Sequence, residues 1–207
     1  MFLFIVKGII IGLLVSAPMG PIGMLTIQRT LLRGRWHGFA TGIGAMLSDL
    51  VYATLIMMTV GKVSHFIEDN RVPFLWISSI ILIGFGFLVY RTNPIKDWAS
   101  NVLPMQTRYI KDFATSFVLT FSNVSIIFVF LTLYTQMSFN PVREGTTQII
   151  IAISTIALGA LIWWFVVTSI VSKMRKHFNR RGLILLNRIV GTIFMIIGVA
   201  GLILNHY

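Results

Sequence analysis

Cysteine is absent from the 207-residue chain, and acidic residues are few. The lack of thiols excludes zinc–thiolate sites, iron–sulfur clusters, redox cysteine pairs and cysteine nucleophiles. Charged residues make up only 11% of the chain, whereas a soluble domain carries about 25%. Hydrophobic residues make up 56%, and the mean hydropathy is +0.86. This composition excludes a soluble enzyme, a disordered tail protein and a disulfide-stapled secreted module, and it indicates a protein with several membrane spans.

Positive charge is in excess, with Lys and Arg at 17, Asp and Glu at 6, and a formal net charge of +11. In a soluble protein this balance would point to a nucleic-acid partner. Here the charges lie in short connectors between apolar runs, where they set the orientation of the chain in the bilayer. We therefore expect membrane lipids as partners and no nucleic acid.

Six apolar stretches reach the length of about 20 residues that crosses about 30 Å of hydrocarbon. None alternates with a period of two, so the backbone inside the bilayer is expected to be helical. The sequence predicts an all-α membrane protein with one transmembrane domain over residues 1–207. The first stretch lacks a charged leader, and we expect a retained helix rather than a cleaved signal. The expected spans are 2–26, 38–61, 73–90, 113–137, 146–172 and 184–204.

Lys and Arg are divided unequally between the connectors, with twelve on one side of the predicted bundle and four on the other. The positive-inside rule places the richer side in the cytoplasm, so both termini are expected outside the inner (plasma) membrane. The expected cytoplasmic connectors are 27–37, 91–112 and 173–183.

Two pairs of spans share short matches at nearly one offset. Residues 43–45 (Ile-Gly-Ala) match 158–160 (Leu-Gly-Ala) 115 residues later, and Ile-Gly at 83–84 recurs at 197–198, offset by 114. So few identities in apolar sequence also arise by chance, and both explanations stay open. A true duplication would give two three-helix halves of opposite orientation in the membrane. Those halves would be residues 1–112 and 113–207.

Pro18, Gly20 and Pro21 interrupt the first apolar run. Proline removes a backbone donor and clashes with the preceding turn, and glycine lowers helix stability further. We therefore expect the first helix to be broken at this Pro-x-Gly-Pro element. Broken helices present partially charged ends to a bound solute, and a mechanical kink that improves packing is the alternative.

Asp49 is the one acidic residue inside a predicted span. An aspartate at the bilayer centre costs about 2.5–3.5 kcal/mol on insertion, so Asp49 is expected to face the bundle interior. There its carboxylate can bind the ammonium of a cationic or zwitterionic solute, or take up and release a proton. The alternative is a structural hydrogen bond to Ser48, Tyr52 or a freed backbone amide of the first helix.

Two further residues complete the candidate site. Asn123 in the fourth span must face a helix or a cavity because lipid cannot satisfy its amide, and Trp164 in the fifth can wall a cavity, stack on a cation or pack. We expect no catalytic residue, no cofactor and no metal ligand, since the four histidines lack metal-ligand spacing. The predicted solute- or ion-binding residues are Asp49, Pro18, Gly20, Pro21, Ser48, Tyr52, Asn123 and Trp164.

A combination of motifs carries a family resemblance. The Pro-x-Gly-Pro element precedes a basic connector at 28–34 and a run of spaced glycines that leads to Asp49 and Tyr52. In this combination the chain resembles the lysine exporter (LysE/RhtB) family of small amino-acid efflux transporters over nearly its full length. The family commonly has Pro-Gly-Pro in the first helix and Asn-Pro in the fourth, whereas here Met19 intervenes and Asn123 precedes Val124. The sequence leaves open whether the fourth span is also broken.

The resemblance implies export of amino acids or related small solutes from the cytoplasm, driven by a proton or ion gradient. We therefore expect a secondary transporter and not an enzyme, with its site between the broken first helix and Asp49. A metal-cation or inorganic-ion exporter and a non-transporting membrane scaffold or assembly protein are the alternatives. Glycine-rich faces would permit a homodimer.

Overall fold

The computed structural model describes residues 1–17, 21–62, 71–91, 108–123, 125–173 and 180–204. Within these ranges the regular structure is helical and contains no strand, so the predicted all-α class is confirmed. The helices are α1 (Phe2–Ser16), α2 (Pro21–Arg33), α3 (Arg35–Lys62), α5 (Arg71–Arg91), α6 (Tyr109–Phe121), α7 (Ser125–Gln136), α8 (Pro141–Glu144), α9 (Thr146–Lys173) and α10 (Arg180–Leu204).

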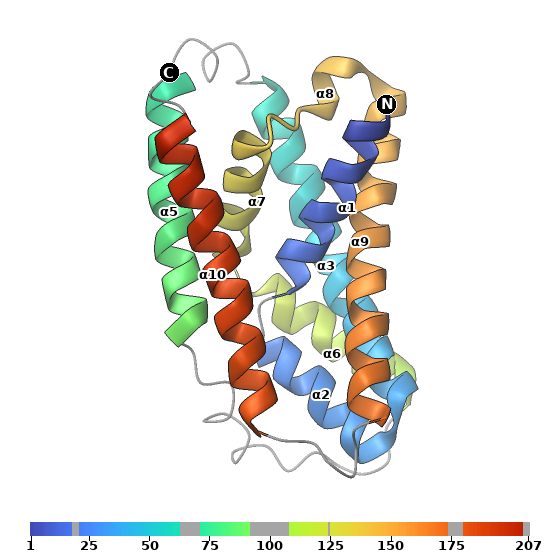
Figure 1. The fold of residues 1–207 in the computed structure, drawn as a ribbon. Coiled ribbons are helices and arrows are strands. Elements are labelled where there is room, and N and C mark those ends of the chain that lie inside the picture. Colours follow the sequence, from blue (N-terminus) through green and yellow to red (C-terminus); the bar gives the residue numbers. More distant parts are fainter. Residues whose placement is uncertain (18–20, 63–70, 92–107, 124, 174–179, 205–207) are drawn as a thin grey trace.

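Long helices frame the bundle and shorter ones fill it (Figure 1). Helices α3 and α9 run its full height and pack on each other, and α5 packs along α10. Helices α1 and α7 occupy the half that carries the N-terminus, whereas α2 and α6 occupy the opposite half. Each end of the bundle therefore contains one short helix from the N-terminal part of the sequence and one that follows residue 108.

Two of the described helices are long and apolar enough to cross a membrane, Arg35–Thr59 within α3 and Thr146–Lys173. The α6–α7 pair makes a third span if its two helices are counted together. Shorter apolar helices lie at Phe2–Ser16, Ser79–Arg91 and Arg188–Ile203. The membrane class is supported by these lengths and compositions, and the count of six spans stays a prediction.

The first predicted span contains two helices. Helix α1 ends at Ser16, and α2 begins at Pro21, a position where proline costs little because a first-turn amide has no partner within its helix. Pro18 and Gly20 lie outside the described residues, so the break at the Pro-x-Gly-Pro element itself stays a prediction.

The fourth predicted span is also divided. Helices α6 and α7 are bent by 73° relative to each other, with Asn123 between them and residue 124 outside the described residues. Helix α6 begins at Tyr109, earlier than the expected start of the span, and thus includes Asp112.

The predicted connector at 27–37 is mostly helical. Helix α2 continues to Arg33, and α3 starts at Arg35, so only Gly34 separates them. Gly34 has a φ of +107°, a left-handed value that favours glycine over residues with a Cβ. The connector folds as a helical hairpin because its polar side chains, including Gln28, Arg29 and Thr30, are buried against other helices rather than solvated.

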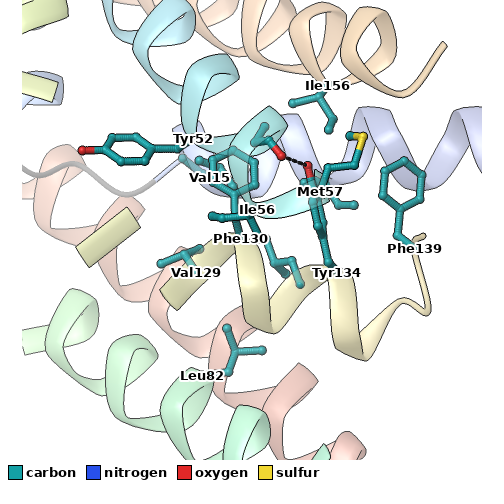
Figure 2. Close-up of a cluster of buried hydrophobic side chains, with 14 of the residues drawn as sticks. Val15, Tyr52, Ile56, Met57, Leu82, Val129, Phe130, Tyr134, Phe139 and Ile156 are labelled. Carbon is teal, nitrogen blue, oxygen red and sulfur yellow. Dashed lines mark hydrogen bonds between the residues drawn. The ribbon is translucent and has the colours of Figure 1, made fainter. Parts of the chain in front are cut away.

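The main apolar core lies around α7 (Figure 2). Phe130, Leu133 and Tyr134 of α7 are fully buried, and Tyr134 donates a hydrogen bond of 3.2 Å to the carbonyl of Ala53 in α3. Residues from α1, α3, α5, α9 and α10 join this cluster. The core fixes α7 in the bundle and thereby places one wall of the space described below.

Two glycines permit close contacts between helices from the two halves of the sequence, residues 1–112 and 113–207. A Cβ at Gly44 of α3 would overlap the carbonyl oxygen of Phe113 in α6, and a Cβ at Gly159 of α9 would overlap that of Ile9 in α1. Gly44 and Gly159, which occupy matching positions in the sequence, thus have equivalent packing. The matched glycines at 84 and 198 do not, since a Cβ at Gly84 would meet no atom of the described residues within 4 Å, whereas one at Gly198 would overlap Ile83.

Candidate functional site

Asp49 lies on α3 with 5% of its surface exposed. It borders a narrow space between helices that leaves no room for a water molecule. The walls come from four helices, and Asp49 supplies the one ionisable side chain among them. The lining residues are Gly12, Val15 and Ser16 of α1, Met46, Asp49 and Leu50 of α3, Phe130 of α7, and Ile156 and Ala160 of α9.

Polar atoms at this space are without partners among the described residues. Asp49 Oδ1 and Ser16 Oγ are buried and make no hydrogen bond. Ser16 is the last residue of α1, so its hydroxyl lies where the first predicted span is interrupted. A buried carboxylate that lacks a partner is costly. The geometry therefore makes Asp49 available to a proton or to a bound cationic group.

Close helix contacts keep the space narrow. A Cβ at Gly12 of α1 would overlap the carbonyl oxygen of Ile156 in α9, and a Cβ at Gly42 of α3 would overlap the Trp164 ring. Because these walls touch, a solute can reach Asp49 only if helices move apart. The structure is thus a closed arrangement of the candidate site.

Ser48 and Tyr52 do not bond to Asp49. Ser48 is fully buried, and its hydroxyl has no partner among the described residues. Tyr52 donates a hydrogen bond of 2.5 Å to the carbonyl of Phe121 and stacks on the Phe121 ring at 5.3 Å. Phe121 ends α6, so Tyr52 satisfies a carbonyl exposed by the end of that helix.

The remaining predicted residues are dispersed. Trp164 is buried on α9 and packs in a cluster with Ala45, Met46 and Ala160, two of which also border the Asp49 space. Asn123 is exposed between α6 and α7 and does not line that space. The structure thus brings Trp164 near the Asp49 space through shared neighbours and leaves Asn123 apart from it.

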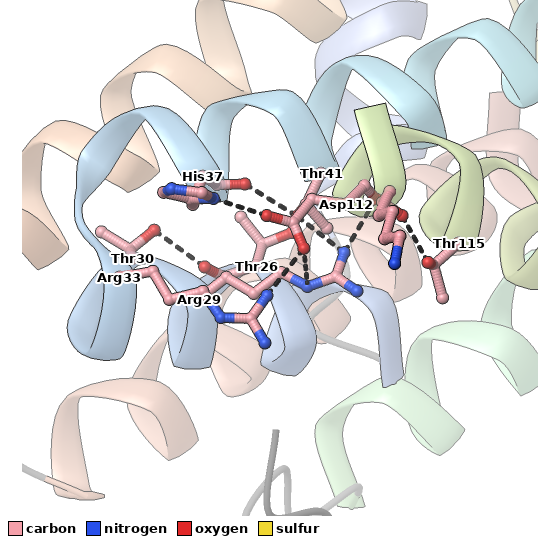
Figure 3. A network of polar contacts seen from close by, with 9 residues as sticks. Thr26, Arg29, Thr30, Arg33, His37, Thr41, Asp112 and Thr115 are labelled. Carbon is pink, nitrogen blue, oxygen red and sulfur yellow. Dashed lines mark hydrogen bonds and ion pairs between the residues drawn. The ribbon is translucent and has the colours of Figure 1, made fainter. Parts of the chain in front are cut away.

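A second buried aspartate has cationic partners (Figure 3). Asp112 of α6 is 1% exposed, and its Oδ1 lies 3.1 Å from Arg29 Nε and 2.8 Å from Arg33 Nη1. Its Oδ2 shares a hydrogen bond of 2.6 Å with His37 Nδ1. We call these four residues the Asp112 cluster. It joins α2, α3 and α6 in the half of the bundle that lies opposite the N-terminus.

Arg29 is held by three acceptors in this cluster. Besides the ion pair with the Asp112 carboxylate, its Nη1 donates to the Asp112 carbonyl at 2.8 Å and to Thr41 Oγ1 at 3.0 Å. Burial lowers the pKa of the Arg29 guanidinium, the charge of Asp112 raises it, and the charge of Arg33 lowers it. Arginine titrates so far above neutral pH that the group stays charged.

The sequence interpretation assigned Arg29 and Arg33 to membrane orientation and to the family motif, and it missed their partner. One local signal was present: Arg29 and Arg33 are four residues apart, so their side chains lie on the same face of the helix. The acid that meets them lies 79 residues beyond Arg33, and no local pattern indicates that distance.

Comparison with known proteins identifies the family. A family model described as LysE type translocator matches residues 13–205. The chain belongs to the LysE-type translocator family. This translocator is 30% identical over 199 residues to a Bacillus subtilis (strain 168) protein named "Putative amino acid efflux protein YcgF", and the match covers 92% of this chain and 90% of the relative. No solved structure gives a significant match. The translocator is a transport protein and not an enzyme.

Proposed function

We propose that this translocator exports amino acids or related small solutes across the inner membrane as a secondary transporter, driven by a proton or ion gradient. The family and the name of the Bacillus relative support the solute class. The observation that carries the proposal is Asp49, a buried carboxylate at a space between four helices, whose Oδ1 makes no hydrogen bond with any described residue.

Asp49 can serve both the solute and the coupling ion. A carboxylate in this position binds an ammonium group or a proton, and each weakens binding of the other. Exchange of the two on opposite sides of the membrane would couple their movements. A membrane potential supplies about 2.3 kcal/mol per charge per 100 mV, which is sufficient to drive accumulation against a gradient.

Six spans in two inverted halves are the architecture that we propose for this mechanism. The division of the chain at α1–α2 and at α6–α7 supports it, as do the exchanged contacts of Gly44 with Phe113 and Gly159 with Ile9. The twelve cations of the connectors would lie in the cytoplasm and both termini outside. The Asp112 cluster would then close the cytoplasmic side.

A flux measurement tests the proposal. The purified protein is placed in lipid vesicles, and efflux of labelled amino acids is screened with and without an imposed pH gradient. We expect gradient-dependent efflux of some amino acids, strongly reduced in Asp49→Asn. Glu144→Gln, a change to an exposed acid on α8, is the matched control and should retain full activity.

Several outcomes would contradict the proposal. Transport by Asp49→Asn at the wild-type rate, with unchanged pH dependence, would remove Asp49 from the mechanism. Flux of metal cations together with cation-dependent protection against thermal unfolding would identify an ion exporter. Absence of flux for every solute would favour a scaffold or assembly protein.

A further inference from the structure

Helices α3 and α6 meet along a line of polar residues. His37, Thr41, Ser48 and Tyr52 lie on one face of α3, spaced by three to four residues or their multiples. The buried face of α6 consists of Asp112, Ser116 and Thr120 at intervals of four. We call these seven residues the α3–α6 seam.

Contacts along the length of the seam show that the two faces oppose each other. His37 bonds to Asp112 at one end, and Tyr52 bonds to the carbonyl of Phe121 at the other. Between them, Gly44 permits the α6 backbone to approach closely at Phe113. Side chains on α3 and α6 between these contacts therefore face the same interface.

Three hydroxyl groups within the seam are buried and lack partners. Ser48 Oγ, Ser116 Oγ and Thr120 Oγ1 make no hydrogen bond among the described residues. Buried polar groups are normally satisfied, and each exception calls for an explanation.

Several threonines elsewhere in the bundle provide a contrast, although Thr26 Oγ1 of α2 is also without a partner among the described residues. Thr30, Thr155 and Thr168 each donate to the carbonyl four residues earlier in their own helix. The same bond is open in principle to the seam hydroxyls. Their lack of it leaves three donors and acceptors directed at the interface between two helices.

The seam connects the Asp112 cluster with the Asp49 region. Ser48 directly precedes Asp49 in the sequence. Thr41, which accepts a hydrogen bond from Arg29, lies eight residues before Asp49, about 12 Å along α3. Beyond Asp49, toward the N-terminal side of the bundle, α3 packs through Ile56 and Met57 into the apolar core with Phe130. Polar groups therefore continue from Asp49 mainly toward the end of the bundle that holds the Asp112 cluster, which we call the basic side.

We propose that the α3–α6 seam is the path by which the exported solute reaches Asp49 from the basic side, and that Arg29 binds the carboxylate of the solute at the mouth of this path. The inference rests on the proposed function. A free carboxylate has the same chemistry as the Asp112 side chain, and a guanidinium can bind either one in a two-point contact. A solute that replaces Asp112 at Arg29 releases α6 from α2 and exposes the seam hydroxyls, which then bind its polar groups.

Cysteine labelling tests the path, since the native chain has no cysteine and a single introduced thiol is unique. Ser116→Cys and Thr120→Cys are made singly and treated with a membrane-impermeant thiol reagent in vesicles. Tyr109→Cys and Glu144→Cys, exposed at opposite ends of the bundle, report the side from which the reagent acts. Ser154→Cys, an exposed position on α9, is the lipid-facing control.

We expect both seam cysteines to react from the side on which Tyr109→Cys reacts, and Ser154→Cys to stay unlabelled. A mixture of the standard L-amino acids without cysteine should slow the labelling, whereas the same mixture as methyl esters, which lack the free carboxylate, should not. Flux of amino acids through the Ser116→Cys protein combined with an unreactive seam would overturn the path and leave the proposed function intact. Absence of amino-acid flux in the wild type would overturn both.

Arg29 variants test the carboxylate contact. In Arg29→Gln, protection of Ser116→Cys should require an amino-acid concentration about tenfold higher or more, since a charge-assisted contact is lost. Arg29→Lys keeps the charge and should restore protection in part. It also serves as the second variant if Arg29→Gln does not fold. Equal protection by amino acids in the Arg29→Gln and wild-type backgrounds, or protection by the methyl esters, would overturn the role of Arg29.

Discussion

Asp49 and Asp112 are both buried aspartates, yet their surroundings differ. Asp112 contacts two guanidinium groups and an imidazole, whereas Asp49 Oδ1 has no hydrogen-bond partner among the described residues. A buried carboxylate with cationic partners stabilises the helices that supply them, and one without partners costs stability unless it serves another purpose. The comparison separates a carboxylate that holds helices together from one that we assign to solute binding.

The largest effect on stability is expected for Asp112→Asn. Removing one member of a buried ion pair costs about 3–5 kcal/mol, because the other charges are left buried and uncompensated. Thermal unfolding in detergent should therefore occur at a markedly lower temperature than for the wild type. An unchanged unfolding temperature would show that the Asp112 cluster does not hold α2, α3 and α6 together.

Asp49→Asn should lower transport strongly and leave stability intact, the opposite of the stability loss expected for Asp112→Asn. We expect transport to fall about 100-fold or more, which corresponds to about 2.7 kcal/mol. The unfolding temperature should stay the same or rise, since the variant removes a buried charge without a partner. A loss of stability as large as that of Asp112→Asn would mean that Asp49 is structural, and the comparison of the two aspartates would fail.

Glycine substitutions test whether the matching contacts of Gly44 and Gly159, one in each half of the sequence, contribute equally to stability. Gly44→Ala and Gly159→Ala each force a Cβ into a backbone carbonyl of a neighbouring helix, and overpacking of this kind costs about 1–3 kcal/mol. The two unfolding temperatures should fall by similar amounts. Gly84→Ala, whose Cβ would have no atom of the described residues within 4 Å, is the control and should be neutral or slightly stabilising. Unequal losses at Gly44 and Gly159 would weaken the case for inverted halves.

Tyr52→Phe should have the smallest effect of the series. It removes the hydrogen bond to the Phe121 carbonyl and keeps the ring stacking, and losing one hydrogen bond of this kind costs about 0.5–1.5 kcal/mol. Transport should decline less than in Asp49→Asn. A loss of transport as complete as that of Asp49→Asn, with stability unchanged, would instead assign Tyr52 to the solute site.

Local sequence patterns predicted the helical membrane class and the interior position of Asp49, because apolar length and the cost of a buried charge are properties of the segment itself. The partners of Asp112 could not be predicted in this way, since Arg29 and His37 lie 83 and 75 residues away in the chain. The bend between α6 and α7 was left open because Val124, and not proline, follows Asn123. The connector at 27–37 was expected only to be cytoplasmic and to set the membrane orientation, and nothing local to it shows that its polar side chains are buried against other helices.

The most direct test of the role of Asp49 is equilibrium binding of a transported amino acid to the purified translocator in detergent. The wild type and Glu144→Gln should bind with equal affinity, and Asp49→Asn should bind about 100-fold more weakly because the ammonium group loses its carboxylate partner. Binding by Asp49→Asn with wild-type affinity would contradict the account.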